Sequence, residues 1–451
     1  MNTKLNFKNN IYVIIQMGLF TFLFLGTEYF YVDVLSQIFT YDKTVVLAQN
    51  CALGASTIGF LLYPLFHRLL SDHLKKIGLL FVGIVSIIGL ILMSSLFTFV
   101  TGLMLFFMLG ILGSCVYYHS MSMMETNQYL ARIVGISYAF GIILQFVSNN
   151  FIRSEFIQSI LLAISCFILI FLLINNSLTS LQVSDDKQDK KSNTVGIILI
   201  ILVALMTCMF STLDNAVTLV HARGHMDIGQ WPRIFLALSG LTSGFIFDLQ
   251  NRRYMGITIY CIMVLSTICI AILKFAGPFM LGLMIFYLSA GFFAVFFITA
   301  FMEIARYMKI PELWSGMGRA VNNMTAAIIA SPVLSLLSSD SNLSVIILIL
   351  VLFVAVSIIS VIYTVQKNDF IKTQTTEVID EKEKLRRFSE LYSFTDREAE
   401  VFDQLVNTED SIQMIAENIY VSKRTLERYV SAIYEKTGVK SRIGLLNLYN
   451  K

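Results

Sequence analysis

The sequence has few charged residues for its length. Asp, Glu, Lys and Arg together make up 14% of its 451 residues, whereas hydrophobic residues make up 56%. A soluble globular protein of this size needs more polar surface than such a composition supplies. The composition therefore excludes a soluble globule and predicts an integral membrane protein.

Cysteine is also scarce, and common catalytic motifs are missing. The six cysteines all lie in apolar runs without CxxC spacing, which is typical of packing residues rather than metal ligands or disulfide partners. The sequence contains no nucleotide-binding glycine loop, no zinc-ligand spacing and no nucleophile constellation. We therefore expect no cofactor, no metal site and no enzymatic activity.

Long apolar runs dominate the first 365 residues. Twelve of them have about the 20 residues that a helix needs to cross a bilayer. They lie near 11–33, 44–66, 77–97, 99–122, 129–148, 156–176, 195–219, 232–249, 255–274, 277–300, 317–337 and 343–365. The fold is therefore predicted to be all-α, with a polytopic bundle of twelve membrane helices followed by a small soluble domain.

The placement of Lys and Arg predicts the orientation of the bundle, because cytoplasmic connections carry more of them. One alternate set of connections carries Lys4, Lys8, Arg68, Lys75, Lys76, Arg132, Lys187, Lys190, Lys191, Arg252, Arg253, Arg306, Lys309 and Arg319. The opposite set carries only Lys43, Arg153, Arg223, Arg233 and Lys274. Both termini are therefore expected to be cytoplasmic. The N-terminal segment resembles a retained signal anchor, because its apolar run is too long for a cleaved signal.

A polar stretch interrupts the apolar runs after the sixth span. Residues 175–194, "NNSLTSLQVSDDKQDKKSNT", have the composition of a flexible linker. The linker predicts two six-span halves, at residues 1–174 and 195–365.

The two halves share a motif at corresponding positions. Asp72 precedes Lys75 and Lys76 in the first half, and Asp248 precedes Arg252 and Arg253 in the second. This pattern resembles the cytoplasmic G-x-x-x-D-R-x-G-R-K motif of the major facilitator superfamily. The second copy, which begins at Gly244, keeps the spacing of that motif, although neither copy has Arg directly after Asp. The resemblance implies a 6+6 bundle with a substrate site near the midplane between the halves.

Two carboxylates interrupt apolar spans, Glu28 in "FLFLGTEYFYVD" and Asp214 in "CMFSTLDNAV". An ionisable side chain at the centre of a membrane helix costs roughly 2.5–3.5 kcal/mol, so each suggests a function. Both stand four residues after a Phe in the first helix of their half, and pseudo-symmetry predicts that they face one cavity. Tyr29, His119, Gln145, Asn215 and Asn322 complete the predicted ligand cavity, with Tyr31 and Asn323 beside them. The alternative is that the carboxylates are solvated near the outer mouth and the amides bridge helices.

The chain becomes soluble in character after residue 365. Residues 366–390 are charge-rich with apolar residues every three or four positions, which predicts a helical connector. Four short helices are predicted over residues 391–451. Thr395 and Glu398 form a capping box, Ser411 and Ser422 are N-caps, and Gly438 ends the third helix.

The second and third of these short helices have the pattern of a helix-turn-helix. Leu426, Val430 and Ile433 form the inward face of the third helix. Its other face carries Lys423, Arg424, Glu427, Arg428 and Ser431. Two helices joined by a tight turn, of which the second has a free basic and polar face, are typical of motifs that read the DNA major groove.

The segment "FTDREAEVFDQL…SIQMIAENIYVSKRTLERYVSAIYEKTGVKSR" resembles the LuxR-family helix-turn-helix. The matching residues are Arg397, Glu398, Glu400, Val401, Ile415, Ala416, Ile419, Val421, Ser422, Thr425, Leu426, Ile433, Lys436, Val439 and Arg442. The resemblance implies that this domain binds double-stranded DNA. Lys423, Arg424, Thr425, Glu427 and Arg428 would touch bases or phosphates, and Ser431 and Arg442 complete the predicted DNA-binding set. It also implies that the closing helix near Leu445, Leu446 and Leu448 helps to form a homodimer.

Together these features predict a one-component transcription regulator in the inner membrane of a bacterium. Its bundle, embedded in membrane lipid, would sense an unknown small molecule or a membrane signal, and its C-terminal domain would bind DNA. One alternative is a major-facilitator-type secondary transporter with a C-terminal regulatory DNA-binding domain. Another is a receptor whose tail recruits protein rather than DNA.

Overall fold

The computed structural model describes residues 2–69, 95–124, 129–152, 154–175, 190–222, 231–276, 279–337, 342–408 and 410–449. All regular elements in these ranges are helices, as the long apolar runs and the pattern of the C-terminal part predicted. The chain divides into two compact units, residues 1–367 and 368–451. Each unit is described separately below.

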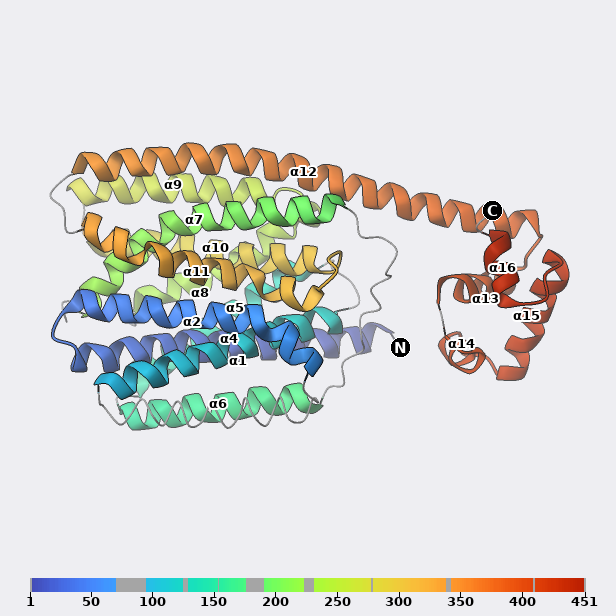
Figure 1. The fold of residues 1–451 in the computed structure, drawn as a ribbon, viewed down its shortest axis with the longest axis horizontal. Helices are drawn as coiled ribbons and strands as arrows, with labels where there is room; N and C mark the ends of the chain where they lie inside the picture. Colours follow the sequence, from blue (N-terminus) through green and yellow to red (C-terminus); the bar gives the residue numbers. More distant parts are fainter. Residues whose placement is uncertain are drawn as a thin grey trace. The chain divides into compact units, whose positions relative to one another are not determined.

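The first unit is a bundle of long helices (Figure 1). They are α1 (Asn2–Ile38), α2 (Asp42–Leu69), α4 (Ser95–Met123), α5 (Leu130–Phe151), α6 (Glu155–Asn175), α7 (Lys190–Ala222), α8 (Ile234–Phe247), α9 (Met255–Ala276), α10 (Phe279–Ala305), α11 (Pro311–Leu337) and α12 (Asn342–Leu391). Each covers most of one predicted span, and α4 also includes residues 95–97 of the span before it. The span predicted at 77–97 lies outside the described residues, apart from its last three.

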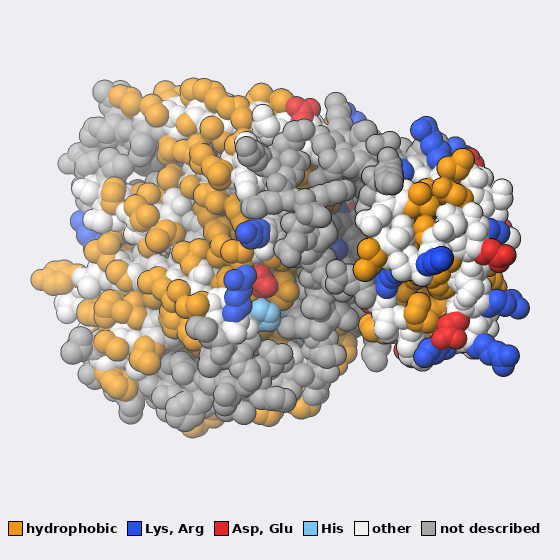
Figure 2. All heavy atoms as spheres, turned by 45° about the vertical axis from the view of Figure 1, so that its right-hand side comes forward, with side chains coloured by type: hydrophobic (Ala, Val, Ile, Leu, Met, Phe, Trp, Pro, Cys, Tyr) orange, Lys and Arg blue, Asp and Glu red, His pale blue; other side chains and the backbone are white. Residues whose placement is uncertain are grey.

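Eight of the described helices are long and apolar enough to cross a membrane, and two shorter apolar helices cover Trp231–Phe247 and Met255–Thr267. The surface of the bundle has the same character. Figure 2 shows hydrophobic side chains spread over the visible face of this unit. On α12, Leu350, Val354, Ile358 and Val361 are all more than half exposed. Apolar side chains exposed over such lengths of helix suit contact with lipid.

The packing of the bundle relates its two halves by an internal symmetry. α2 packs against α11, and α5 packs against α8. Each pair joins the second helix of one half to the fifth helix of the other. Side-chain hydrogen bonds between the halves reinforce the contact of α2 with α7 and α11: Asn50 Nδ2 donates to Asn215 Oδ1 at 3.0 Å, and Asn323 Nδ2 donates to Ser56 Oγ at 2.8 Å.

Glycine allows α5 and α8 to approach closely. A Cβ atom on Gly135 would lie 2.5 Å from the carbonyl oxygen of Gly240 and 2.8 Å from the Cα of Gly244. Close backbone approach of this kind is typical of small residues in membrane helix interfaces.

We expect Gly135→Val to destabilise the contact between the halves, because its side chain would overlap backbone atoms that cannot move independently. Overpacking of this kind typically costs about 1–3 kcal/mol. Thermal unfolding of the purified protein in detergent measures the effect. Gly282→Val is the matched control, because a Cβ at Gly282 would meet nothing within 4 Å. Equal melting temperatures for the two variants would contradict the prediction.

α12 is one helix of 50 residues, so the last predicted span and the predicted connector form a single element. Its residues from Asn368 onward belong to the second unit. That unit also contains α13 (Asp396–Asn407), α14 (Ile412–Asn418), α15 (Lys423–Thr437) and α16 (Arg442–Tyr449). These helices enclose a separate core that includes Phe402, Leu405, Ile415, Leu426 and Ile433.

Candidate functional sites: a charged cavity and a basic helix face

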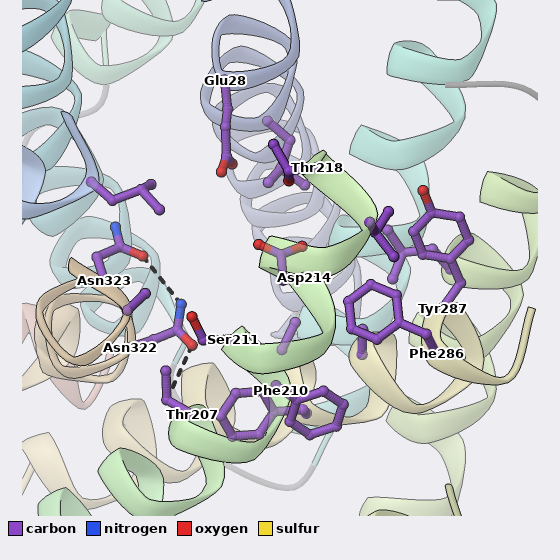
Figure 3. A pocket seen from close by; sticks show the side chains of 18 of the residues that line it. Glu28, Thr207, Phe210, Ser211, Asp214, Thr218, Phe286, Tyr287, Asn322 and Asn323 are labelled. Carbon is purple, nitrogen blue, oxygen red and sulfur yellow. Dashed lines mark hydrogen bonds between the residues drawn. The ribbon is translucent and has the colours of Figure 1, made fainter. Parts of the chain in front are cut away.

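A cavity of about 180 Å³ lies inside the bundle, lined from α1, α2, α5, α7, α8, α10 and α11 and by Arg233 just before α8. Its charged lining consists of Glu28, Asp214, Arg233 and Arg319, together with His221. Figure 3 shows the carboxylates of Glu28 and Asp214 directed into the same space from different helices. The cavity therefore brings residues from both halves together.

Four of the seven predicted cavity residues line this space: Glu28, Tyr29, Asp214 and Asn322. The additional candidate Asn323 does so as well. Gln49 Nε2 donates to Glu28 Oε1 at 2.8 Å. Thr207 Oγ1 donates to Asn322 Oδ1, and Asn322 Nδ2 donates to Asn323 Oδ1, both at 3.2 Å (Figure 3). These bonds hold the amides against the cavity wall.

The other three predicted cavity residues do not line the cavity. His119 Nδ1 lies 3.1 Å from Gln16 Oε1, and Gln145 Nε2 donates to the carbonyl oxygen of Leu25 at 2.8 Å. Asn215 bonds Asn50, as described above. Adjacent residues on a helix point about 100° apart, so Asp214 faces the cavity while Asn215 faces α2. The three polar groups instead connect helices, as the alternative interpretation expected of amides.

Two arginines of the cavity were not among its predicted residues. Arg319 and Arg233 are 7% and 9% exposed. The Arg319 guanidinium lies over the rings of Phe24 and Phe297, with its carbon 4.9 and 5.6 Å from their centroids. The distribution of Lys and Arg along the sequence had assigned both to connections between spans. The spacing of Arg319 to Asn322 and Asn323, three and four residues on, could have revealed the shared helix face.

The second motif copy forms a buried ionic network. Asp248 accepts hydrogen bonds from the backbone N–H groups of Ala131 and Arg132, at 3.2 and 2.8 Å, at the start of α5. Arg252 donates from Nη1 to Asp248 and from Nε to Glu303, both at 3.0 Å.

Lys367 on α12 completes the network by donating to Glu303 at 2.7 Å. The network thus links α5 of the first half, the α8–α9 connection, α10 and α12. Arg253, the second basic residue of the motif, is exposed instead.

The second unit shows the predicted local signals. Thr395 and Glu398 form a reciprocal capping box, and Ser411 and Ser422 cap α14 and α15. Gly438 ends α15 in the left-handed conformation, with φ 72°. These four predictions are confirmed. Caps could be predicted because they depend on neighbours within a few residues along the chain.

The predicted DNA-contact face of α15 is open to solvent. Lys423, Arg424, Glu427, Arg428 and Ser431 are exposed on it. Thr425 is half-buried, and its hydroxyl lies 2.7 Å from Ser422 Oγ at the helix start. The opposite face buries Leu426, Val430 and Ile433 in the core. The helix therefore exposes a basic, polar face while its opposite face is held against the core of the domain.

Arg442 has a different position from the other predicted DNA contacts. Its guanidinium donates to the carbonyl oxygens of Leu405 at 2.8 Å, Asp410 at 2.6 Å and Thr408. It therefore secures the connection between α13 and α14 rather than extending toward a ligand. Leu445, which was predicted to help form a homodimer, is also directed inward. It is fully buried in the core of its own domain, whereas Ile443 on the same helix is 71% exposed.

Glu398 is the acidic centre of another internal contact. Lys436 Nζ donates to Glu398 Oε2 at 2.5 Å and to the carbonyl oxygen of Ser393 at 2.9 Å. Burial raises the pKa of the Glu398 carboxyl, but hydrogen bonds from Lys436 and Thr395 outweigh burial and hold this pKa below its usual value.

We expect the second unit to lose stability as the pH falls. A carboxyl with a lowered folded-state pKa stabilises the fold above its unfolded pKa of about 4.3, and this contribution disappears as pH drops through the lower folded value. Melting temperatures of fragment 366–451 between about pH 6 and pH 3 test this. Glu398→Gln should flatten the curve, and the exposed Glu400→Gln should not. A Glu398→Gln curve parallel to that of the native fragment would contradict the assignment.

Within the described part of the chain, no group of three or more His, Cys, Asp or Glu side chains is arranged to hold a metal ion. The cavity and the α15 face are the two candidate sites.

Comparisons with known proteins identify the two units separately. Residues 392–448 match the family model described as "Bacterial regulatory proteins, luxR family". No curated protein matches the chain. The C-terminal domain is thus a LuxR-family helix-turn-helix domain.

Solved structures with a similar fold include major facilitator superfamily transporters. The transporter FucP in the outward conformation is 12% identical, over 79% of this chain and 97% of that chain, with a TM-score of 0.55. The proton:xylose symporter XylE is 14% identical, over 82% of this chain and 97% of that chain, with a TM-score of 0.56. The membrane unit therefore has the fold of this superfamily, and the chain is an integral membrane protein.

Proposed function

We propose that this chain, a major-facilitator-like bundle joined to a LuxR-type DNA-binding domain, is a one-component transcription regulator of the bacterial inner membrane. The bundle binds a small molecule, and the C-terminal domain binds double-stranded DNA from the cytoplasmic side. The main support is that α12 contains both bundle residues and residues of the second unit. A change in the bundle therefore has a direct covalent route to the DNA-binding domain.

The ionic network supports a mechanism for this coupling. Lys367, the last residue of the bundle unit, pairs with Glu303, and Glu303 pairs with Arg252. Arg252 pairs with Asp248, which caps α5 of the other half. A ligand that binds one arrangement of the halves better than another shifts their populations. In this proposal, rearrangement of the halves breaks or forms the Lys367 ion pair and changes the DNA-binding population of the tail.

The alternative function is a secondary transporter whose tail regulates expression. The carboxylates Glu28 and Asp214 in the cavity favour it, because paired acids in a membrane cavity suit coupling to protons or cations. Measurements of substrate flux in proteoliposomes distinguish the two functions. A transporter must carry its substrate across the membrane, whereas a regulator needs only to bind its ligand.

The deciding experiment titrates fragment 366–451 against DNA from upstream of its own and adjacent genes at two salt concentrations. Saturable, sequence-selective binding that weakens steeply with salt is expected. If the fragment is folded by circular dichroism, yet fails to bind even as a forced dimer, the regulator proposal is wrong. A protein-docking role for the tail would then be the better interpretation.

A further inference from the structure

The cavity combines charges of both signs in one space inside the bundle. Glu28 and Asp214 supply two carboxylates, and Arg233 and Arg319 supply two guanidinium groups. The charge of Arg233 acts on both acids, and that of Arg319 acts on Glu28. No salt bridge joins these arginines to the acids within the described residues. The opposite charges are therefore near one another but remain unpaired by direct contact.

The arginines also have hydrogen-bonding capacity to spare. Nε of Arg233 and both Nε and Nη2 of Arg319 are buried without a well-aligned hydrogen-bond acceptor among the described residues. The Tyr117 hydroxyl lies near the Arg319 guanidinium and can accept from it, but a guanidinium has five N–H donors. Arg252, which is 4% exposed, has a carboxylate at 3.0 Å from each of two nitrogens. Buried donors in proteins normally have partners, and a guanidinium matches the planar geometry of a carboxylate. The free donors of Arg319 thus indicate a site for an anionic group.

The acids have capacity for a cationic group in the same cavity. A carboxylate can accept about four hydrogen bonds, and Glu28 accepts one from a side chain, that of Gln49. The carboxylate of Asp214 points into the same space (Figure 3). An ammonium group can donate three hydrogen bonds and is attracted by both acids. A simple cation would leave the arginine donors unsatisfied, and a simple anion would be repelled by the two carboxylates.

The rest of the lining combines polar side chains, such as Thr207, Ser211 and Asn322, with a group of aromatic ones. Phe210 and Phe293 stack with their centroids 4.7 Å apart. The ring of Phe286 lies 6.4 Å from that of Phe210 and 5.6 Å from that of Tyr287, between centroids (Figure 3). The volume of about 180 Å³ is below the roughly 300–1,000 Å³ of pockets for drug-sized ligands. The space therefore suits a small molecule with an apolar part.

We propose that the cavity binds a small zwitterion of the amino-acid class. Its carboxylate lies on Arg319, its ammonium group lies between Glu28 and Asp214, and its apolar part lies along Phe210. This inference rests on the proposed function, because it names the ligand of the same cavity. Both charges of the ligand are required. The carboxylate accepts hydrogen bonds from the arginines, and the ammonium group donates hydrogen bonds to the acids.

Calorimetric titration of the full-length protein in lipid nanodiscs tests this assignment. Each common L-amino acid is titrated, and the best binder is compared with its decarboxylated amine and its deaminated acid; for L-phenylalanine these are 2-phenylethylamine and 3-phenylpropionate. The amino acid should bind at least about tenfold more tightly than either, because each analogue lacks one of the two charged groups that form hydrogen bonds with the cavity. Equal binding of either analogue, or no binding of any amino acid by folded protein, overturns the proposal.

Variants assign the charges to residues. In Arg319→Gln, the amino acid should bind no more tightly than its decarboxylated amine. In Glu28→Gln, the affinity for the amino acid should fall toward that for the deaminated acid. Arg319→Lys should recover part of the preference for the carboxylate, which a purely structural role of Arg319 would not predict. Arg253→Gln is the matched control, since Arg253 is exposed outside the cavity. An unchanged preference in Arg319→Gln would contradict the assigned orientation.

DNA binding in the same preparations separates this proposal from the proposed function. Selective promoter binding without amino-acid binding overturns only the ligand class. Amino-acid binding with the predicted charge requirement, but without any effect on DNA occupancy, supports the ligand class and overturns the regulator.

Discussion

Replacing Lys423 and Arg428 together with alanine is expected to abolish most of the DNA affinity of the C-terminal domain without unfolding it. Both side chains are exposed on the free face of α15, and neither contributes to the core beneath that helix. A base contact is worth about 1–3 kcal/mol, so the loss of two contacts should lower affinity by roughly 30-fold or more. The slope of log affinity against log salt should also fall, by about 1 for each phosphate that the variant no longer neutralises.

Fluorescence anisotropy with labelled promoter DNA measures both quantities. The control is Arg386→Ala in α12, which removes a side chain that is 63% exposed and lies outside the helix-turn-helix. Circular dichroism confirms that each variant is folded. A double variant that binds as tightly as the native fragment, with the same salt slope, would show that α15 is not the DNA-contact helix.

Replacing Phe402 with alanine is expected to remove DNA binding by a different route, the loss of the folded domain. Phe402 is fully buried and stacks on Phe388, with centroids 4.8 Å apart and an angle of 5° between the rings. Its ring also contacts Phe394 and Tyr449, at centroid distances of 5.3 and 5.4 Å. Truncation of a buried Phe to Ala typically costs about 3–5 kcal/mol, because it leaves a cavity where this packing was.

That cost is comparable to the whole stability of a domain of this size, for which a single core rarely supplies more than about 3–5 kcal/mol. Urea unfolding of fragment 366–451 should therefore show a variant that is largely unfolded in water. Tyr420→Ala is the control, because Tyr420 is 90% exposed and its removal should change stability by less than about 0.5 kcal/mol. A Phe402→Ala fragment as stable as this control would mean that the aromatic cluster does not hold the domain together.

The small C-terminal domain was more predictable than the bundle. The Thr395–Glu398 capping box and the Ser422 cap join residues three apart along the chain. Such local signals can be recognised in a sequence because the partners are fixed by helix geometry alone. Arg442 shows the limit of this reasoning: its type matched the family pattern, but its partners are carbonyl groups more than thirty residues away.

In the bundle, an intramembrane charge marked a site more reliably than an intramembrane amide. Glu28 and Asp214 both line the cavity. The amides divide: Asn322 and Asn323 line it, whereas Gln145 and Asn215 bond to neighbouring helices. A buried charge is costly unless it has polar surroundings, so it tends to lie where the bundle is hollow. An amide can be satisfied by one carbonyl or amide on an adjacent helix, and its presence in a span does not indicate a cavity.

The sequence by itself determined the membrane character of the chain, its all-helical content, the LuxR-type domain and the capped helix that presents Lys423 and Arg428. These follow from composition, periodicity and contacts within one or two helical turns. Only the tertiary structure decided that Arg319 and Arg233 share a cavity with Glu28 and Asp214, that Lys367 closes an ionic network, and that Arg442 turns inward. Each of these depends on how helices distant in sequence rotate and pack against one another, and helical periodicity leaves that rotation open.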